Sequence, residues 1–168
     1  ARNVAAGLPA LPSIIMTFRK SPRLPQFEYR GTYAYSVTLV TTLRRPLFTD
    51  TALVAGSLHH LGIAAGKYGF DVIAYCFMPD HLHLLVTGDE WSSLNDFMRH
   101  FKQLTGYYYK QETGEKLWQT SYWDRIARAE DDLEDVARYI WGNPVRAGLV
   151  TDYRDYAASG PRPMLELI

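Results

Sequence analysis

Two histidines separated by one residue, His81 and His83, are the side chains of this sequence best suited to bind a metal ion. Side chains in a strand alternate between its two faces, so in an extended segment both imidazoles point the same way. Imidazole suits zinc, copper, iron and nickel, and the pair alone does not name the ion. The alternative is that both residues merely occupy a half-exposed strand face. A third ligand would decide between these interpretations.

A tyrosine and an asparagine form a second candidate group near the end of the chain. Tyr139 and Asn143 are four residues apart, which places a phenol and an amide on one face of a helix. Pro144 follows directly and disfavours a helical backbone at Asn143. The alternative interpretation is that Tyr139 packs in the core and that Asn143 serves the turn at the helix end.

A third feature is a stretch of basic and aromatic residues between Phe97 and Arg128. Six basic residues face three acidic ones there, which leaves a charge of plus three: Arg99, Lys102, Lys110, Lys116, Arg125 and Arg128 against Glu112, Glu115 and Asp124. Such residues, interleaved with tyrosine and tryptophan, can contact phosphates and stack on unpaired bases. An amphipathic helix followed by a core-facing strand would give the same composition.

Length and charge limit the classes of protein that fit. A chain of 168 residues suits one domain. Its 18 Lys and Arg balance 18 Asp and Glu, so any nucleic-acid site must be a local patch rather than the whole surface. The first 30 residues are a proline-rich arm of charge plus four, which includes Arg19, Lys20 and Arg23. One cysteine and the absence of a long apolar run predict a cytoplasmic protein with no membrane partner.

The helices and strands that must position these residues are predicted from the polarity pattern and from the residues that begin or end such elements. Strands are expected at 32–41, 70–77, 81–87 and 117–127, and helices at 50–67, from Ser92 or Ser93 onward, and from 130–132 to Pro144. The order of strand, helix, strand, strand, helix and strand is the ferredoxin-like (RRM-like) pattern. We therefore predict an α+β fold: an antiparallel sheet with helices on one face and an additional C-terminal helix that carries Tyr139.

Three sequence motifs, in their order along the chain, resemble those of the small tyrosine transposases of the His-hydrophobic-His (HUH) endonuclease superfamily. The first is the phrase YCFMPDHLHLLV at 75–86, the second is LWQ followed by YWD between 117 and 124, and the third is YIWGNPVRAGLV at 139–150. The last phrase is similar to the REP-associated branch in particular. The resemblance runs from about Gly31 to Tyr156. It divides the chain into the arm at 1–30, an endonuclease domain at 31–156 and a tail at 157–168.

The resemblance implies a site and a reaction. His81 and His83 would bind a divalent cation, Mg²⁺ or Mn²⁺, with Asn143 as the third ligand. Tyr139 would be the nucleophile that cleaves and rejoins single-stranded DNA at hairpins or repeats through a 5′-phosphotyrosine link, in DNA transposition. Arg99, Lys102 and Lys110, with Arg19, Lys20 and Arg23 of the arm, are the candidates for holding the DNA.

Several alternatives stay open at this stage. The chain could be a catalytically inactive or domesticated protein that only binds repeat DNA. It could also be a metal-dependent hydrolase in which the histidines activate water and Tyr139 is structural. The resemblance is compatible with a monomer and with a homodimer that exchanges the tyrosine helix between subunits.

Overall fold

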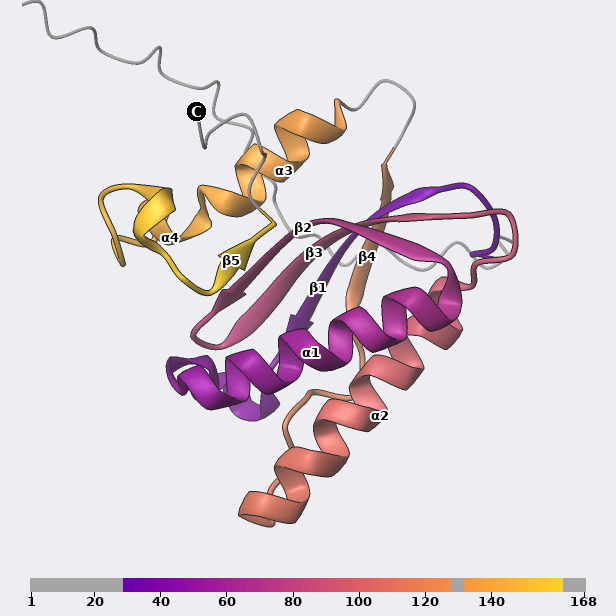
Figure 1. The fold of residues 1–168 in the computed structure, drawn as a ribbon. Coiled ribbons are helices and arrows are strands. Elements are labelled where there is room, and N and C mark those ends of the chain that lie inside the picture. Colours follow the sequence, from indigo (N-terminus) through magenta and orange to yellow (C-terminus); the bar gives the residue numbers. More distant parts are fainter. Residues whose placement is uncertain (1–28, 128–131, 162–168) are drawn as a thin grey trace, which may run out of the picture.

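The computed structural model describes residues 29–127 and 132–161, which form one antiparallel sheet with helices against it (Figure 1). The strand order is β4-β1-β3-β2-β5. The strands are β1 (Ala34–Val40), β2 (Phe70–Met78), β3 (His81–Gly88), β4 (Trp123–Ala127) and β5 (Ser159–Gly160), and the helices are α1 (Thr51–Tyr68), α2 (Leu94–Thr113), α3 (Leu133–Trp141) and α4 (Asn143–Arg146). The predicted ferredoxin-like α+β fold is confirmed.

Local sequence sets the bounds of the two long helices. The Asp50 carboxylate accepts hydrogen bonds from the backbone of Ala52 and Leu53 and caps α1. Ser93 caps α2 in the same way by accepting from the backbone of Asp96. Between them, Pro79 and Asp80 make the tight turn that joins β2 to β3, as the sequence predicts.

The sheet is covered on both faces, and the two faces have separate cores. Leu82 and Leu84 of β3 point toward α1 and α2 and belong to the larger core. Leu85 points the other way, where it meets Ala137 and Ile140 of α3. The pair α1 and α2 therefore lies on one face, as predicted for the ferredoxin-like unit, and the additional helix lies on the opposite face (Figure 1). His81 and His83 share the face of Leu85 because they alternate with Leu82 and Leu84.

The predicted strand at 117–127 is shorter in the structure, where only Trp123–Ala127 is a strand. Trp118 turns its ring into the core instead, and its indole N–H donates to Thr105 on α2 at 2.8 Å. Lys102 donates to the backbone oxygens of Gln119 and Thr120, both at 2.8 Å. These contacts draw the segment toward α2 and away from regular pairing, and a single bridge from Trp118 to Thr41 remains.

The predicted final helix is divided in two. Helix α3 ends at Trp141, and α4 begins at Asn143 with Pro144 in its first turn. The backbone N–H groups in the first turn of a helix have no partner within the helix, so proline, which lacks this N–H, is tolerated there. Pro144 therefore lies at the start of a helix, whereas the sequence predicted that it ends one.

Described residues outside the predicted bounds of 31–156 also pack against the sheet. Tyr29, within the predicted arm, is buried in the larger core. At the other end, β5 pairs with β2, and the Tyr156 hydroxyl donates to the backbone oxygen of Phe77 at 2.8 Å. In the part of the chain that the structure describes, none of the helices is long and apolar enough to cross a membrane.

Two glycines that end helices allow a matched stability test. Gly69 and Gly114 end α1 and α2 with φ of +68° and +76°, where an L side chain costs about 1–2 kcal/mol. A Cβ at Gly114 meets nothing within 4 Å, whereas one at Gly69 would lie 2.3 Å from the Asp89 carboxylate. That carboxylate accepts from the Trp91 backbone at 3.1 Å, a bond that must break if it moves.

We expect Gly69→Ala to lower the free energy of unfolding by about 1 kcal/mol more than Gly114→Ala, the typical worth of one hydrogen bond. Urea denaturation of the two variants measures the difference. Equal losses would mean that Asp89 moves aside freely.

Candidate metal and nucleophile site

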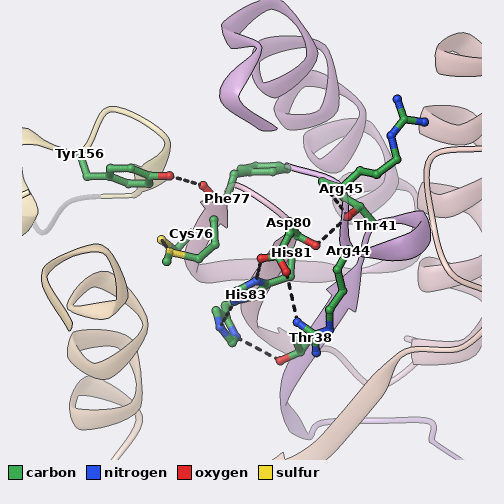
Figure 2. A network of polar contacts seen from close by, with 11 residues as sticks. Thr38, Thr41, Arg44, Arg45, Cys76, Phe77, Asp80, His81, His83 and Tyr156 are labelled. Carbon is green, nitrogen blue, oxygen red and sulfur yellow. Dashed lines mark hydrogen bonds and ion pairs between the residues drawn. The ribbon is translucent and has the colours of Figure 1, made fainter. Parts of the chain in front are cut away.

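The two histidine rings meet at the start of β3 with their outer nitrogens directed at one point. His81 Nε2 and His83 Nε2 are 3.0 Å apart, and the rings are nearly perpendicular, at 87° (Figure 2). His83 is buried, with 6% of its surface exposed, while His81 is partly open to solvent. Burial lowers the pKa of His83 to about 3, and the electrostatic effects of the neighbouring His81 and Arg146 side chains lower it further. His83 is therefore a neutral imidazole, the form that binds metal ions.

The opposite nitrogen of each ring has its own partner. His81 Nδ1 lies 2.5 Å from Asp80 Oδ1, and His83 Nδ1 lies 3.0 Å from Thr38 Oγ1 on β1. Arg44 donates to the second carboxylate oxygen of Asp80 at 3.1 Å (Figure 2). Partial burial raises the pKa of Asp80, but hydrogen bonds from His81 and Arg44 outweigh it and hold the pKa below its ordinary value. Asp80 is thus an anion that accepts the Nδ1 proton of His81, which leaves the lone pair on Nε2.

The backbone around Asp80 is fixed by the loop that follows β1. The Thr41 hydroxyl donates to the backbone oxygens of both Asp80 and Arg45. Leu43 and Arg44 are consecutive non-glycine residues in the left-handed region, with φ of 57° and 53°. Strained residues persist only where their surroundings hold them, and here the loop presents the Arg44 guanidinium to Asp80.

The histidine pair fits a cation with octahedral coordination. With both Nδ1 atoms acting as donors, two lone pairs face each other across 3.0 Å and repel unless a positive charge lies between them. Two nitrogens that each lie about 2.1 Å from one ion are about 3.0 Å apart when the nitrogen–metal–nitrogen angle is a right angle, and about 3.4 Å apart when it is tetrahedral. In the described residues, no third His, Cys, Asp or Glu joins the pair as a metal-binding cluster, so further ligands must be of another kind.

Tyr139 and Asn143 lie at the junction of α3 and α4, where Arg146 contacts both. The Arg146 Cζ is 3.8 Å from the centroid of the Tyr139 ring. The same guanidinium donates to Asn143 Oδ1 at 2.8 Å and to the backbone oxygen of Tyr139. The amide nitrogen of Asn143 donates to the backbone oxygen of Ile140 at 3.1 Å. The phenol and the amide are therefore brought together, as the four-residue spacing predicted, with Arg146 between them.

This junction lies on the same face of the sheet as the histidines. Helix α3 packs against β2 and β3 through Ala137, Ile140 and Trp141. Burial raises the pKa of Cys76, on the neighbouring strand, to about 12, and the charge of Arg146 opposes that rise. The charge of Arg146 also acts electrostatically on His83.

The predicted DNA-binding residues have different surroundings. Arg99 is exposed and forms an ion pair with Asp96 on its own helix, at 2.6 Å. Lys110 lines a groove of about 600 Å³ between α2 and the segment 114–120, together with Lys102, Lys116 and Tyr107. Lys102 also donates hydrogen bonds to the backbone oxygens of Gln119 and Thr120 in that segment. Arg19, Lys20 and Arg23 lie outside the described residues.

Three partners of the site were not predicted from sequence: Asp80, Thr38 and Arg146. Asp80 directly precedes His81, and Arg146 follows Asn143 by three residues, one helical turn, so sequence proximity could have pointed to both. Thr38 is 45 residues from His83 and reaches it only through the β1–β3 register. Only the fold could identify it.

The family model "Transposase IS200 like" matches residues 30–143, which include both histidines, Tyr139 and Asn143. This chain belongs to the IS200-like transposase family. Among its relatives, a REP-associated tyrosine transposase of Escherichia coli K12 is 26% identical over 139 residues, which cover 79% of this chain and 81% of that protein. A Haemophilus influenzae protein, provisionally named a REP-associated tyrosine transposase, is 30% identical over 108 residues. That match covers 55% of this chain and 59% of the relative.

The family's fold is also found among solved structures. A REP-associated tyrosine transposase bound to a REP hairpin superposes with a TM-score of 0.65 at 22% sequence identity, covering 80% of this chain and 79% of the other. At this identity the likeness shows the fold. The family match and the two relatives confirm the resemblance to tyrosine transposases that the sequence carries.

Proposed function

We propose that this member of the IS200-like transposase family cleaves and rejoins single-stranded DNA at hairpins or repeats, through a covalent link between Tyr139 and a 5′-phosphate. The observation that carries the proposal is the convergence of His81 Nε2 and His83 Nε2 at 3.0 Å on the sheet face that also bears the tyrosine junction. The E. coli relative, named a REP-associated tyrosine transposase, supports the same activity.

In the proposed reaction the Tyr139 oxygen attacks a backbone phosphorus. The bond from phosphorus to the 3′ oxygen breaks, the phenol gives up its proton, and the departing 3′ oxygen takes up a proton to become a hydroxyl. A different 3′-hydroxyl can reverse the step and join two strands. Because the phosphotyrosine link conserves the bond energy, the exchange needs no nucleotide cofactor.

We further propose a divalent cation, Mg²⁺ or Mn²⁺, as the resident cofactor. His81 and His83 would hold it, with the Asn143 amide oxygen as the third ligand. When bound, such an ion polarises a phosphate oxygen and stabilises the charge that develops during attack. The chain's own part is to direct the two nitrogens: Asp80 and Thr38 fix the orientation of the two rings before any ligand is present.

The DNA path is proposed to begin at the groove on α2 and to pass around the end of β1 to the histidine pair, which lies on the opposite face of the sheet. Gln119 in the groove wall donates its backbone N–H to Val40 at 2.9 Å, and Val40 pairs with His81 in the sheet. Lys110 and Lys116 supply positive charge, and the ring of Tyr107, which is well exposed, offers a stacking surface for a base.

The test is incubation with labelled single-stranded hairpins in Mn²⁺ or Mg²⁺, followed by denaturing gel electrophoresis. We expect a labelled protein band that forms only with metal. Hairpin binding with no such band would favour a repeat-binding protein without catalysis. Cleaved DNA without a covalent band would favour hydrolysis by activated water.

Asp80→Ala should weaken Mn²⁺ binding by about 10- to 100-fold, the usual effect of removing an outer partner of a metal-binding histidine. The backbone of Asp80 still accepts from Thr41 in this variant, so the loop is retained. Titration calorimetry with Mn²⁺ alone measures the change, and Asp71→Ala on β2 is the exposed acidic control. An unchanged affinity would show that Asp80 does not orient His81.

Lys110→Ala should weaken hairpin binding and reduce the slope of log affinity against log salt by about 0.7–0.9, the equivalent of one phosphate contact. Lys67→Ala, on α1, is the control for loss of one exposed charge. Lys102→Ala should also lower thermal stability, because it frees the carbonyls of Gln119 and Thr120. Identical salt slopes for wild type and Lys110→Ala would place the DNA elsewhere.

A further inference from the structure

One guanidinium, that of Arg146, joins the nucleophile to the predicted third ligand. It stacks on the Tyr139 ring with 3.8 Å between Cζ and the ring centroid, donates to Asn143 Oδ1 at 2.8 Å and donates to the backbone oxygen of Tyr139. These contacts use the flat face and the edge of the group at once, which a lysine ammonium cannot do. Arg146 is otherwise exposed, so burial alone does not hold it there.

The chain leaves room for this guanidinium at one residue. A Cβ placed on Gly142 would lie 2.8 Å from Arg146 Nη1 and 3.2 Å from the backbone oxygen of Arg138. Gly142 has φ of −75° and ψ of −6°, a right-handed conformation open to any L residue. Its backbone does not require glycine, but a side chain at this position would displace the Arg146 guanidinium.

A second arginine close to Tyr139 in sequence, on α3, is arranged differently. Arg138, directly before Tyr139, is exposed and forms an ion pair with Glu134 one turn away. It carries the same charge on α3, yet its guanidinium pairs along the helix surface. Proximity in sequence to the tyrosine therefore does not explain the arrangement of Arg146.

We propose that Arg146 is the positioning residue of Tyr139, locking its ring and the Asn143 amide in one arrangement across the gap between α3 and α4. The inference rests on the proposed function, because it assigns Arg146 a part in the same strand-cleavage reaction. Without Arg146, the ring of a partly exposed tyrosine can turn about its side-chain bonds, and the junction keeps only the Asn143 amide bond to Ile140 and its backbone contacts. Attack on phosphorus depends on alignment, and a displacement of about 1 Å can slow such a step by about 100-fold.

The first experiment compares Arg146→Ala, Arg146→Lys and the control Arg138→Ala. Single-turnover cleavage of a labelled hairpin should slow by about 10- to 100-fold in Arg146→Ala, with hairpin affinity within about threefold of wild type. Arg146→Lys should recover only a small part of the rate, because the charge alone does not stack and bridge. Arg138→Ala should match wild type. Equal rates in all four proteins would overturn the proposal.

A second experiment reports on the ring without DNA, metal or turnover. With 3-fluorotyrosine placed at position 139, the ¹⁹F signal of the free protein should move or broaden in Arg146→Ala and stay unchanged in Arg138→Ala. An unmoved signal in Arg146→Ala would show that the guanidinium does not hold the ring. Because this measurement needs no catalysis, it separates failure of the positioning role from failure of the proposed reaction.

Gly142→Ala distinguishes positioning from general damage to the fold. The added methyl group should displace the guanidinium while keeping its charge and a helix-compatible backbone, so the ¹⁹F signal and the cleavage rate should change as in Arg146→Ala. Adding Gly142→Ala to Arg146→Ala should cause little further loss, since both changes break one arrangement. Additive losses, or a fall in Gly142→Ala activity that follows its melting temperature alone, would contradict the proposal.

Discussion

Tyr139→Phe is expected to abolish the covalent protein–DNA product and to slow hairpin cleavage by at least about 1,000-fold, because it removes the oxygen that forms the new bond to phosphorus in the proposed reaction. The phenyl ring is retained, and with it the surface on which Arg146 stacks. Hairpin affinity and the melting temperature should therefore stay close to those of wild type. Denaturing electrophoresis of labelled DNA, with and without protease digestion, measures the adduct directly.

The control for this variant is Tyr68→Phe, which removes a hydroxyl from α1 on the opposite face of the sheet. It should form the covalent product at the rate of wild type. A Tyr139→Phe protein that still forms the adduct would move the nucleophile to another tyrosine. A Tyr139→Phe protein that cleaves without an adduct would instead support water as the nucleophile.

The sequence was sufficient for most of the fold because its boundaries are marked by local chemistry. Asp50 and Ser93 begin helices through side-chain hydrogen bonds to the backbone, and Gly69 ends one through its backbone angles. Alternation along β3 also gave the shared face of His81 and His83. These are short-range effects, which a single sequence records well.

The differences arise where distant contacts override local preference. The residues 117–122 have strand-like composition, but Trp118 is drawn to Thr105 and Lys102 binds the neighbouring carbonyls. The close approach of the Arg146 guanidinium to Gly142 is a contact that no periodicity reveals. The outer partner Thr38 likewise depends on strand register. Side chains that contact the site from a different strand or helix are therefore the part of the site that the sequence alone does not predict.

The histidine pair allows a second test with a large expected effect. His81→Ala and His83→Ala should each weaken Mn²⁺ binding by more than about 100-fold, a larger effect than loss of an outer partner, because a directly binding nitrogen is lost. Cleavage should fall in parallel while hairpin binding persists. His83 is buried and bonded to Thr38, so its replacement also lowers stability, whereas the half-exposed His81 can be replaced with less damage. Mn²⁺ titration followed by electron paramagnetic resonance measures the free ion directly.

The double variant shows whether the two nitrogens hold one ion. If both bind the same cation, His81→Ala combined with His83→Ala should lose little more affinity than either single change, because the site is already broken by the first. His100→Ala, which removes a partly exposed histidine on α2, should bind Mn²⁺ as wild type does. Independent, additive losses would indicate two weak sites, and undiminished Mn²⁺ affinity in both single variants would place the cation away from this pair. The 3.0 Å separation of the two Nε2 atoms favours one shared ion.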